Sequence, residues 1–492
     1  MGNAALALVR FSGDVGIKAR ATRRQFERRL INNLRDAIAS QGSSPRVHPS
    51  HDRVFVELRS RGQADALTRV FGVQSVSLVE RRCGTRLPEI VSAGEELFRE
   101  RVRGRRFAVR ARRVGDRSRI PVKAGEVNRA LGDALLPISA GVDLDDPEVT
   151  VHLEILEDAT CFLSERIPAH GGVPLGAEAR AVALISGGFD SAVAAWQILR
   201  RGVRLDYVFC NLGGAAHLQG ALRVVKVLAD RWSYGTHPQL HVIDFEGLSA
   251  ALQARTETRY WQVLLKRLML RAAEDVARER RATAVVTGDA VAQVSSQTLQ
   301  NLSVISQAAS GLILRPLAGS NKEEIIELAE RIGTFELSKV VGEYCAMVPS
   351  RPATGASLPA ILAQEEKLDL SLVDRAVAAR TRIDLRGFDV EKLDLPEIEV
   401  EGVPEGATVI DLRSKAEFES WHYPGALHLE FSEALRVFPR IDRSQNYVLY
   451  CEFGLQSAHL AELMRREGFQ AFHVKRGTKA LRRSVERPVG AG

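Results

Sequence analysis

The six residues from Ser186 to Ser191, Ser-Gly-Gly-Phe-Asp-Ser, have the types and spacing of a phosphate-binding loop. Paired glycines let the backbone turn, so that successive N–H groups and both serine hydroxyls can face one anion. The helix favoured by residues 192–200 would add its positive N-terminus. Asp190 suits a cation or a reacting phosphate oxygen. A Walker A loop requires Gly-Lys-Ser or Gly-Lys-Thr, which this run lacks, so a different type of phosphate loop is indicated.

Enzymes with such a loop resemble ATP pyrophosphatases, which activate a carbonyl oxygen as an AMP ester and expel pyrophosphate. The resemblance implies ATP with its Mg²⁺ as the ligand. We expect Asp190 to assist the departure of pyrophosphate, and a purely structural turn aspartate is the alternative. The residues of this segment predicted to contact the nucleotide are Leu184, Ile185, Ser186, Gly187, Gly188 and Ser191.

A second candidate for chemistry is Cys451, which follows the strand-like residues 447–450 and precedes Glu-Phe-Gly-Leu-Gln-Ser457. The amides of such a loop, with the positive end of the next helix, lower a thiol pKa and stabilise a persulfide anion. The loop, with Asp411-Leu-Arg413 and His428 before it, resembles a rhodanese domain. A buried small hydrophobic residue at a strand end is the alternative for Cys451.

Two positions of the Cys451 loop indicate which sulfur donor it accepts. Cysteine phosphatases need an arginine six residues after the cysteine to bind phosphate, and this chain has Ser457 there. Many rhodanese loops carry arginine after the cysteine or at the loop end, where this chain has Glu452 and Ser457. We therefore expect a protein-bound persulfide as the donor instead of thiosulfate.

The chain has 492 residues, 45% of them hydrophobic, and a net charge of +7. This length predicts three or four domains. No apolar stretch is long enough for a membrane span or a signal peptide, so we expect a cytoplasmic protein. Basic residues concentrate in the N-terminal half, which favours a polyanionic partner over a merely solvated face. They are Lys18, Arg20, Arg23, Arg24, Arg28, Arg29, Arg99, Arg101, Arg103, Arg105, Arg106, Arg110, Arg112, Arg113, Arg117 and Arg119.

The five cysteines are an odd number and are widely spaced, which excludes a disulfide scaffold. No Cys-x-x-Cys pair or Cys/His cluster has metal-ligand spacing, so no metal site is predicted. Cys83 and Cys161 are interpreted as structural.

Residues 1–80 alternate strand and helix patterns and predict a small α+β domain, and residues 81–172 predict a second one. In these domains we expect strands at 6–11, 53–58, 107–112 and 149–155 and helices at 22–40, 63–70, 88–100 and 125–136. The Pro/Gly-rich run 170–176 separates them from the next domain.

Residues 173–365 alternate strands and helices, which implies a doubly wound parallel sheet. We expect strands at 181–185, 205–209, 240–245, 284–287 and 312–314 and helices at 192–200, 260–278 and 321–332. Ligands bind at the carboxyl ends of such strands, so the phosphate loop, Phe209-Cys210 and Gly288-Asp289 should share one crevice. Residues 366–402 are predicted to be a linker, and 403–492 a small α/β domain.

The combination of these parts resembles the ThiI family of 4-thiouridine synthetases over the whole chain. Besides the loops already described, the motifs that carry the resemblance are Arg10-Phe-Ser-Gly-Asp-Val-Gly-Ile-Lys18, Gly171-Gly-Val-Pro-Leu-Gly176, Asn211-Leu-Gly-Gly-Ala-Ala-His217, Lys266-Arg267, Thr287-Gly-Asp-Ala290, Gln293-Val-Ser-Ser-Gln-Thr-Leu-Gln300, Arg315-Pro-Leu317, Lys322 and Glu343-Tyr-Cys345.

The resemblance implies a ferredoxin-like domain and a THUMP domain that bind tRNA, a PP-loop ATP pyrophosphatase domain that adenylates, and a rhodanese domain. It implies that ATP adenylates O4 of uridine 8 in tRNA. Sulfur reaches Cys451 as a persulfide from a cysteine desulfurase and displaces AMP at C4. Cys345 matches the resolving thiol, which would form a disulfide with Cys451, and a loop cysteine without chemistry is the alternative.

By the same resemblance Lys266 contacts the nucleotide. Gly288 would permit close approach of the backbone to the nucleotide, and Gln297 offers it an amide. The position of Phe209 and Cys210 at a strand end suggests a wall of the adenine pocket, and we expect Lys322 to neutralise phosphate in the transition state. For Lys266, a solvent-facing lysine is the alternative. Asn321 stands where the family commonly has aspartate and should still cap its helix.

Two other functions stay open. The first is a sulfur relay for thiamine thiazole formation, in which Cys451 passes sulfur to the C-terminus of a carrier protein. The second is an RNA-binding protein whose enzymatic parts are inactive. The intact Ser186 to Ser191 loop and the intact Cys451 loop argue against the second.

Overall fold

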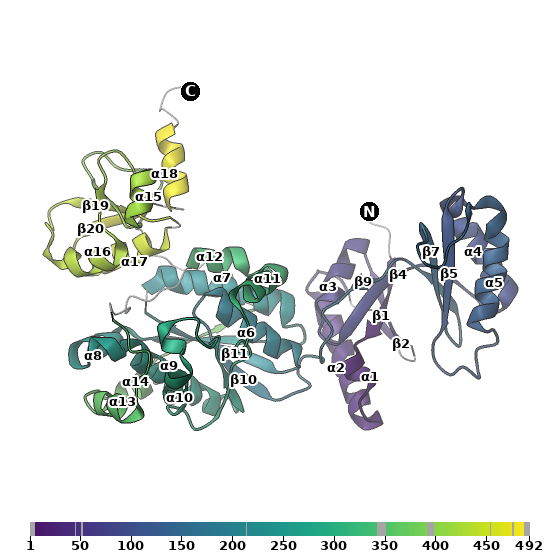
Figure 1. Ribbon diagram of the computed structural model, residues 1–492, viewed down its shortest axis with the longest axis horizontal. Helices are drawn as coiled ribbons and strands as arrows, with labels where there is room; N and C mark the ends of the chain where they lie inside the picture. The colour runs from purple at the N-terminus through teal and green to yellow at the C-terminus, as the bar shows by residue number, and fades with distance from the viewer. Residues whose placement is uncertain are drawn as a thin grey trace. The chain divides into compact units, whose positions relative to one another are not determined.

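The computed structural model describes residues 5–44, 46–50, 53–212, 214–341, 351–390, 398–452, 454–474 and 477–486 (Figure 1). The chain divides into two compact units. The first contains the chain up to Glu178 together with residues 199–204 and 231–236, and the second contains the rest.

The first unit has one sheet with the order β2-β3-β1-β4-β8-β7-β5-β6, and β9 also pairs with β4. Its strands are β1 (Ala5–Phe11), β2 (Val47–Ser50), β3 (Arg53–Leu58), β4 (Val73–Cys83), β5 (Arg106–Arg113), β6 (Gly141–Val142), β7 (Val149–Ile155), β8 (Thr160–Leu163) and β9 (Ile167–Pro168). β4 pairs with β1 through residues 73–79 and with β8 through residues 79–83. The predicted boundary at 80/81 therefore falls inside a strand that both halves share.

Helices pack on this sheet in two groups, each with its own core. The first group is α1 (Gly13–Gly16), α2 (Arg20–Ala39) and α3 (Ala64–Thr68), and the second is α4 (Leu87–Val102) and α5 (Ala124–Leu135), which lies beside β5 and β7 in Figure 1. Leu30 and Leu34 of α2 pack with Val9 of β1, and Leu131 of α5 packs with Val109 of β5. The predicted strands and helices of this half are confirmed within a few residues.

Three buried charged side chains join the two halves of the sheet. Glu154 of β7 is 2% exposed and accepts hydrogen bonds from Arg10 Nε of β1 at 2.8 Å and from Arg53 Nε of β3 at 2.7 Å. Arg10 also donates to the Ser77 hydroxyl at 3.0 Å. A small core accompanies this cluster and consists of Leu8, Phe55, Leu156, Cys161 and Leu163. The face of the sheet without helices is therefore closed partly by apolar side chains and partly by ion pairs.

The second unit begins with a six-stranded sheet of order β14-β13-β10-β11-β12-β15. Its strands are β10 (Arg180–Leu184), β11 (Arg204–Asn211), β12 (Gln239–Asp244), β13 (Ala284–Val286), β14 (Leu312–Leu314) and β15 (Thr381–Asp384). β13 pairs in parallel with β10 and β14, and β12 pairs in parallel with β11. The chain order reverses between β10 and β13, so this is the switch point at which doubly wound sheets bind ligands.

The helices around this sheet are α6 (Phe189–Arg200), α7 (Gly214–Trp232), α8 (Glu246–Arg255), α9 (Trp261–Glu279), α10 (Leu299–Ser306), α11 (Lys322–Ile332), α12 (Phe335–Val341), α13 (Leu358–Glu365) and α14 (Ser371–Ala378). α9 carries much of the core on one side of the sheet. α6 begins three residues earlier than predicted, so Asp190 lies in its first turn. Asn321 caps α11 through a reciprocal pair of hydrogen bonds with Glu324, as predicted for a helix N-cap.

The prediction that residues 366–402 form a linker is wrong for their first half. α14 buries Val373 and Val377 against the nucleotide domain, and β15 pairs antiparallel with β12 at the sheet edge. The short Thr-Arg-Ile-Asp strand has only one inward apolar residue, Ile383, because an edge strand exposes its other side. A weak pattern of this kind resembles a linker in the sequence.

The C-terminal domain has a five-stranded parallel sheet of order β16-β20-β19-β17-β18. Its elements are β16 (Glu399–Val400), β17 (Thr408–Asp411), α15 (Lys415–Ser420), β18 (Leu427–His428), α16 (Phe431–Val437), β19 (Asn446–Tyr450), α17 (Leu455–Arg466), β20 (Gln470–Val474) and α18 (Gly477–Glu486). β19 is central, and Cys451 follows its last residue, as expected for a residue presented at a strand end.

Candidate active sites

The phosphate loop connects β10 to α6 and is held by its own side chains. The Ser191 hydroxyl donates to the Gly188 carbonyl at 2.9 Å, and the Ser186 amide donates to the Ser191 hydroxyl at 3.3 Å. The Gly188 amide donates to the Ser186 hydroxyl at 3.3 Å. Ile185 is buried, and its amide donates to the Val208 carbonyl of β11. The hydroxyls of Ser186 and Ser191 thus hold the conformation of the loop.

Two glycines are required by close contacts around this loop. Gly187 has φ +85°, and a Cβ there would lie 2.7 Å from Val341 Cγ1. A Cβ on Gly288 would lie 2.7 Å from the Ser191 amide nitrogen and 2.9 Å from the Asp190 carbonyl carbon. Gly288 therefore lets the segment after β13 touch the first turn of α6. This contact brings Asp289 next to the phosphate loop.

Asp190 is held on one side only. Its Oδ2 accepts a hydrogen bond from Gln293 Nε2 at 3.0 Å and lies 3.7 Å from Lys322 Nζ, which also sits over the Phe189 ring. Its Oδ1 is buried and has no partner among the described residues. A carboxylate oxygen in this state suits a cation such as Mg²⁺ or a hydrogen-bond donor on a ligand.

Asp289 binds two cationic side chains at the carboxyl end of β13. Its Oδ1 accepts from Lys266 Nζ of α9 at 2.8 Å, and its Oδ2 accepts from the Thr287 hydroxyl at 2.7 Å and from Arg315 Nε at 3.3 Å. Gln297 Nε2 approaches Oδ1 at 3.4 Å. Burial would raise the pKa of Asp289, but these partners outweigh it and lower the pKa to about 2. Lys266 is therefore paired instead of solvent-facing.

Phe209 and Cys210 lie on opposite faces of β11, because successive strand residues alternate. Cys210 belongs to the core around α9, and Phe209 packs edge-on against His217 with 4.8 Å between ring centroids. Only one of the two side chains can therefore face a given pocket. Burial raises the pKa of the Cys210 thiol, which fits its interpretation as structural and not nucleophilic.

His217 contacts the backbone of the phosphate loop at Ser186. Its Nε2 lies 3.3 Å from the Ser186 carbonyl oxygen. Burial lowers the pKa of His217 to about 4, so the ring is neutral at pH 7 and Nε2–H is the donor to Ser186.

Cys451 is 3% exposed and lies in a turn that leads into α17. The Gly454 amide donates to Cys451 Sγ at 3.2 Å, and the Ser457 hydroxyl lies 3.6 Å from the same sulfur. Gly454 has φ +91°, a left-handed conformation that favours glycine and turns its N–H inward. The sulfur is thus cradled by an amide, a hydroxyl and a helix N-terminus, an arrangement that stabilises a sulfur anion.

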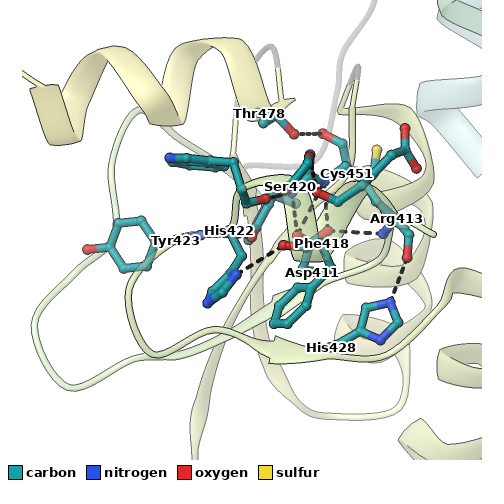
Figure 2. A network of polar contacts seen from close by, with 12 residues as sticks. Asp411, Arg413, Phe418, Ser420, His422, Tyr423, His428, Cys451 and Thr478 are labelled. Carbon is teal, nitrogen blue, oxygen red and sulfur yellow. Dashed lines mark hydrogen bonds and ion pairs between the residues drawn. The ribbon is translucent and has the colours of Figure 1, made fainter. Parts of the chain in front are cut away.

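An ion-paired frame holds the strand ends beneath this loop (Figure 2). Asp411 is fully buried and accepts from Arg413 Nη2 at 2.6 Å, and Arg413 Nη2 also donates to the Trp421 carbonyl at 2.6 Å. The Arg413 guanidinium lies 5.5 Å from the Tyr450 ring, and its Nη1 lies 3.6 Å from Glu452 Oε2. Arg413 therefore connects β17 to both neighbours of Cys451 in the chain.

The last helix completes the cradle. The Thr478 amide donates to the Cys451 carbonyl at 3.1 Å, and the Thr478 hydroxyl donates to the same oxygen at 3.3 Å (Figure 2). A Cβ on Gly477, which has φ +62°, would lie 2.3 Å from the Cys451 carbonyl oxygen. α18 thus begins directly on the loop.

The structure brings most of the predicted nucleotide residues together at the switch point. Leu184 ends β10 there, and the phosphate loop, Gly288, Lys266, Gln297 and Lys322 are linked to it through Asp190 and Asp289. Cys345 lies outside the described residues. Residues for which the sequence predicted no individual role are His217, Gln293, Asp289 and Arg315. Their place in the quoted motifs was the available signal.

Within the described residues no cluster of three or more His, Cys, Asp or Glu side chains could hold a metal ion by itself. In the same part of the chain, no helix has the length and apolar content that crossing a membrane requires.

Four family descriptions match successive parts of the chain. They are the ThiI ferredoxin-like domain at residues 6–77, the THUMP domain at 84–165, "Thiamine biosynthesis protein (ThiI)" at 176–370 and the rhodanese-like domain at 399–484. These matches follow the order predicted from the sequence.

Full-length relatives are similar over nearly the whole chain. A tRNA sulfurtransferase of Pyrobaculum aerophilum is 35% identical over 479 residues, which cover 95% of this chain and 96% of the relative. A tRNA sulfurtransferase of Proteus mirabilis is 35% identical over 482 residues, which cover 95% of this chain and 99% of the relative.

Solved structures show the same architecture. A 4-thiouridine synthetase in complex with RNA and bound ATP superposes with a TM-score of 0.67 at 27% identity, over 77% of this chain and 99% of that one. PH1313 of Pyrococcus horikoshii superposes with a TM-score of 0.53 at 23% identity, over 67% of this chain and 99% of that one.

Proposed function

The chain belongs to the ThiI family, and from this premise we propose that it is an ATP-dependent tRNA sulfurtransferase that makes 4-thiouridine at position 8 of tRNA. The observation that carries the proposal is the phosphate loop at the switch point, where Asp190 has an Oδ1 without a partner among the described residues and Lys322 Nζ lies 3.7 Å from its Oδ2. The adjoining Asp289 binds two further cations, Lys266 and Arg315. The relatives named tRNA sulfurtransferase support the substrate, and the RNA complex with ATP of a similar structure supports the two ligands.

The first step we propose is adenylation. O4 of the uridine attacks the α-phosphorus of ATP, a P–O bond forms, and the bond to pyrophosphate breaks. Asp190 would hold the Mg²⁺ that accompanies ATP, and bound Mg²⁺ supplies charge neutralisation for the leaving pyrophosphate. Lys322, 3.7 Å from Asp190, stabilises the same negative charge, and the loop amides bind phosphate.

The second step is sulfur transfer. A cysteine desulfurase donates a sulfur atom to Cys451, which becomes a persulfide. The terminal sulfur attacks C4 of the adenylated uridine and a C–S bond forms. The bond between C4 and the ester oxygen of AMP breaks, and AMP leaves. The amide of Gly454 and the hydroxyl of Ser457 stabilise the persulfide anion before attack.

The third step frees the product. A thiolate of Cys345 attacks Cys451 Sγ, so the S–S bond to the tRNA-bound sulfur breaks and a Cys345–Cys451 disulfide forms. An external dithiol then reduces this disulfide by two electrons. The resemblance supports this role, because Cys345 belongs to the motif Glu343-Tyr-Cys345.

A second candidate function is the sulfur relay for thiamine thiazole formation, with a small carrier protein as the acceptor. The family description "Thiamine biosynthesis protein (ThiI)" favours it, and the cradle of Cys451 is complete within the C-terminal domain. This function would not require Asp190.

The deciding experiment incubates the purified full chain with unmodified tRNA, Mg-ATP, cysteine and a cysteine desulfurase, and measures 4-thiouridine by mass spectrometry. We expect product from the wild type and none from Cys451→Ala or Asp190→Ala, with Asp190→Ala still loading sulfur on Cys451. Absence of product with wild-type protein whose Cys451 is loaded would contradict the tRNA function and favour the relay.

A further inference from the structure

Arg315 has no role in the steps above, although its surroundings are unusual for a structural arginine. It follows the last residue of β14, at the carboxyl edge of the sheet where the phosphate loop also lies. Its Nε donates to Asp289 Oδ2 at 3.3 Å, and its Nη2 is buried without a partner in the described part of the chain. A buried donor without an acceptor is destabilising, so an arginine kept in this state suggests a ligand.

The charge balance around Arg315 favours an anion. Asp289 is the shared partner of Arg315 and Lys266, so one negative charge faces two positive charges. Lys322 and Asp190 beside them add one charge of each sign. The five groups therefore carry a net charge of +1 next to the phosphate loop, because three cations face two carboxylates.

The contact between Gly288 and the phosphate loop indicates which group of a ligand Arg315 could bind. Asp289 directly follows Gly288, whose backbone touches the carbonyl carbon of Asp190 and the amide of Ser191. A guanidinium anchored on Asp289 is thereby tied to the phosphate loop at the start of α6. Adenine is uncharged, and an orphan N–H in a positive cluster is suited to a phosphate oxygen.

We propose that Arg315 binds a β- or γ-phosphate oxygen of ATP during adenylation, and that Asp289 is the positioning residue that holds Arg315 and Lys266 for this contact. The inference rests on the proposed adenylation function and extends it by two residues.

The same helix that carries Lys266 offers a matched comparison. Arg267 and Arg271 of α9 share Glu365, with Nε–Oε1 at 2.8 Å and Nη2–Oε2 at 3.0 Å, and the Arg271 Nε is also buried without a partner within the described residues. This cluster has the same two cations on one carboxylate, but its partners lie on α10 and α13 instead of at the phosphate loop. An orphan donor alone is thus insufficient, and Arg271→Met is the control.

The experiment measures binding of Mg-ATP, AMP and adenosine to the full chain without tRNA, by equilibrium dialysis, for the wild type and for Arg315→Met, Arg315→Lys, Asp289→Asn and Arg271→Met. We expect Arg315→Met to weaken ATP binding at least 10-fold with adenosine binding unchanged, and Arg315→Lys to restore part of it. Asp289→Asn should weaken ATP in the same way, and the Asp289→Asn, Arg315→Met double variant should be no worse than Arg315→Met, because the two residues act as one unit. Arg271→Met should bind ATP like the wild type.

Two results would overturn the inference. One is ATP binding within twofold of wild type in Arg315→Met, which would mean that Arg315 does not touch the nucleotide. The other is an equal loss of ATP and adenosine binding in Arg315→Met and Arg315→Lys, which would mean a general structural role. Because no tRNA is present, these outcomes are separate from a failure to make 4-thiouridine.

Discussion

At the scale of single residues, the nucleotide site depends on side chains that hold other side chains. His217 supports the carbonyl of Ser186, Gln293 orients Asp190, and Asp289 pairs with Lys266. Each of these three residues fixes the position or charge of a neighbour. Their substitution should therefore change the dependence of activity on pH or charge more than it changes the fold.

His217 makes the nucleotide domain less stable in acid. Its folded pKa of about 4 lies below the ordinary 6.5, because burial disfavours the charged ring. The unfolded chain therefore binds more protons between pH 6.5 and 4, and stability falls as pH falls through that window. We expect a loss of about 2 kcal/mol at pH 5 relative to pH 7 from this group. Urea unfolding of the wild type and His217→Gln measures it, and an equal pH dependence in both proteins would contradict it.

Lys322 should affect turnover more than tRNA binding. It lies 3.7 Å from Asp190, where the proposed adenylation step would develop negative charge as pyrophosphate leaves. We expect Lys322→Ala to lower kcat for 4-thiouridine formation about 100-fold and to leave the Kd for tRNA within twofold. Lys339→Ala, at an exposed lysine of the neighbouring α12, is the control and should match the wild type. A weaker tRNA complex with normal kcat would refute the assignment.

At the scale of elements, the two chemical centres are built differently. The phosphate loop is a strand-to-helix turn braced from other strands, because Gly288 after β13 packs on the start of α6. The Cys451 loop is braced by a later helix, since Thr478 at the start of α18 donates two hydrogen bonds to the Cys451 carbonyl. The Cys451 loop therefore depends on α18, which follows it by 26 residues.

Gly477→Ala tests this dependence. The added Cβ would lie 2.3 Å from the Cys451 carbonyl oxygen and 2.4 Å from that of Glu452, so the loop must shift. Gly468→Ala is the matched control, because Gly468 also has positive φ, in the same domain, but nothing lies within 4 Å of the new Cβ. We expect Gly468→Ala to cost about 1 kcal/mol and to keep Cys451 loading. Gly477→Ala should cost more and lose persulfide loading, measured by thermal melting and by mass spectrometry of Cys451. Equal behaviour of the two variants would contradict this view.

At the scale of the whole molecule, the ferredoxin-like and THUMP domains of the N-terminal unit share one continuous sheet. β4 runs through both halves, and the buried cluster of Arg10, Arg53 and Glu154 connects β1 and β3 to β7 across the middle. Buried charges favour one arrangement over alternatives, because a shifted arrangement leaves an ion unpaired. We infer that this cluster keeps the ferredoxin-like and THUMP halves in one orientation.

Glu154→Gln should strongly destabilise this unit. Burial would raise the pKa of Glu154, but the hydrogen bonds and charges of Arg53 and Arg10 hold this pKa below its usual value. The carboxylate is therefore ionised and pairs with both arginines. Removing its charge takes away the carboxylate that both buried arginines bind, and we expect a loss of about 3–5 kcal/mol. Calorimetry of the variant against Glu165→Gln, an exposed glutamate, measures it. Identical transitions would show that the cluster contributes nothing.

The sequence alone determined the features that depend on local chain chemistry. Ser186 to Ser191 and the Cys451 loop are contiguous, so their turn residues and flanking strand and helix patterns can be recognised directly, as can the alternation of β7 and the cap at Asn321. The motif resemblance added the order of the domains, which the family matches confirm.

Only the tertiary structure decided which distant residues meet. Glu154 lies 144 residues from Arg10, and Lys266 lies 23 residues from Asp289, and no local pattern relates them. It also decided that residues 371–384 belong to the nucleotide domain, because the edge strand β15 is specified by its pairing with β12 and not by its own composition. Strand pairing and burial depend on contacts between segments that are distant in the sequence. Charge partners and edge strands can therefore be identified only from the folded structure.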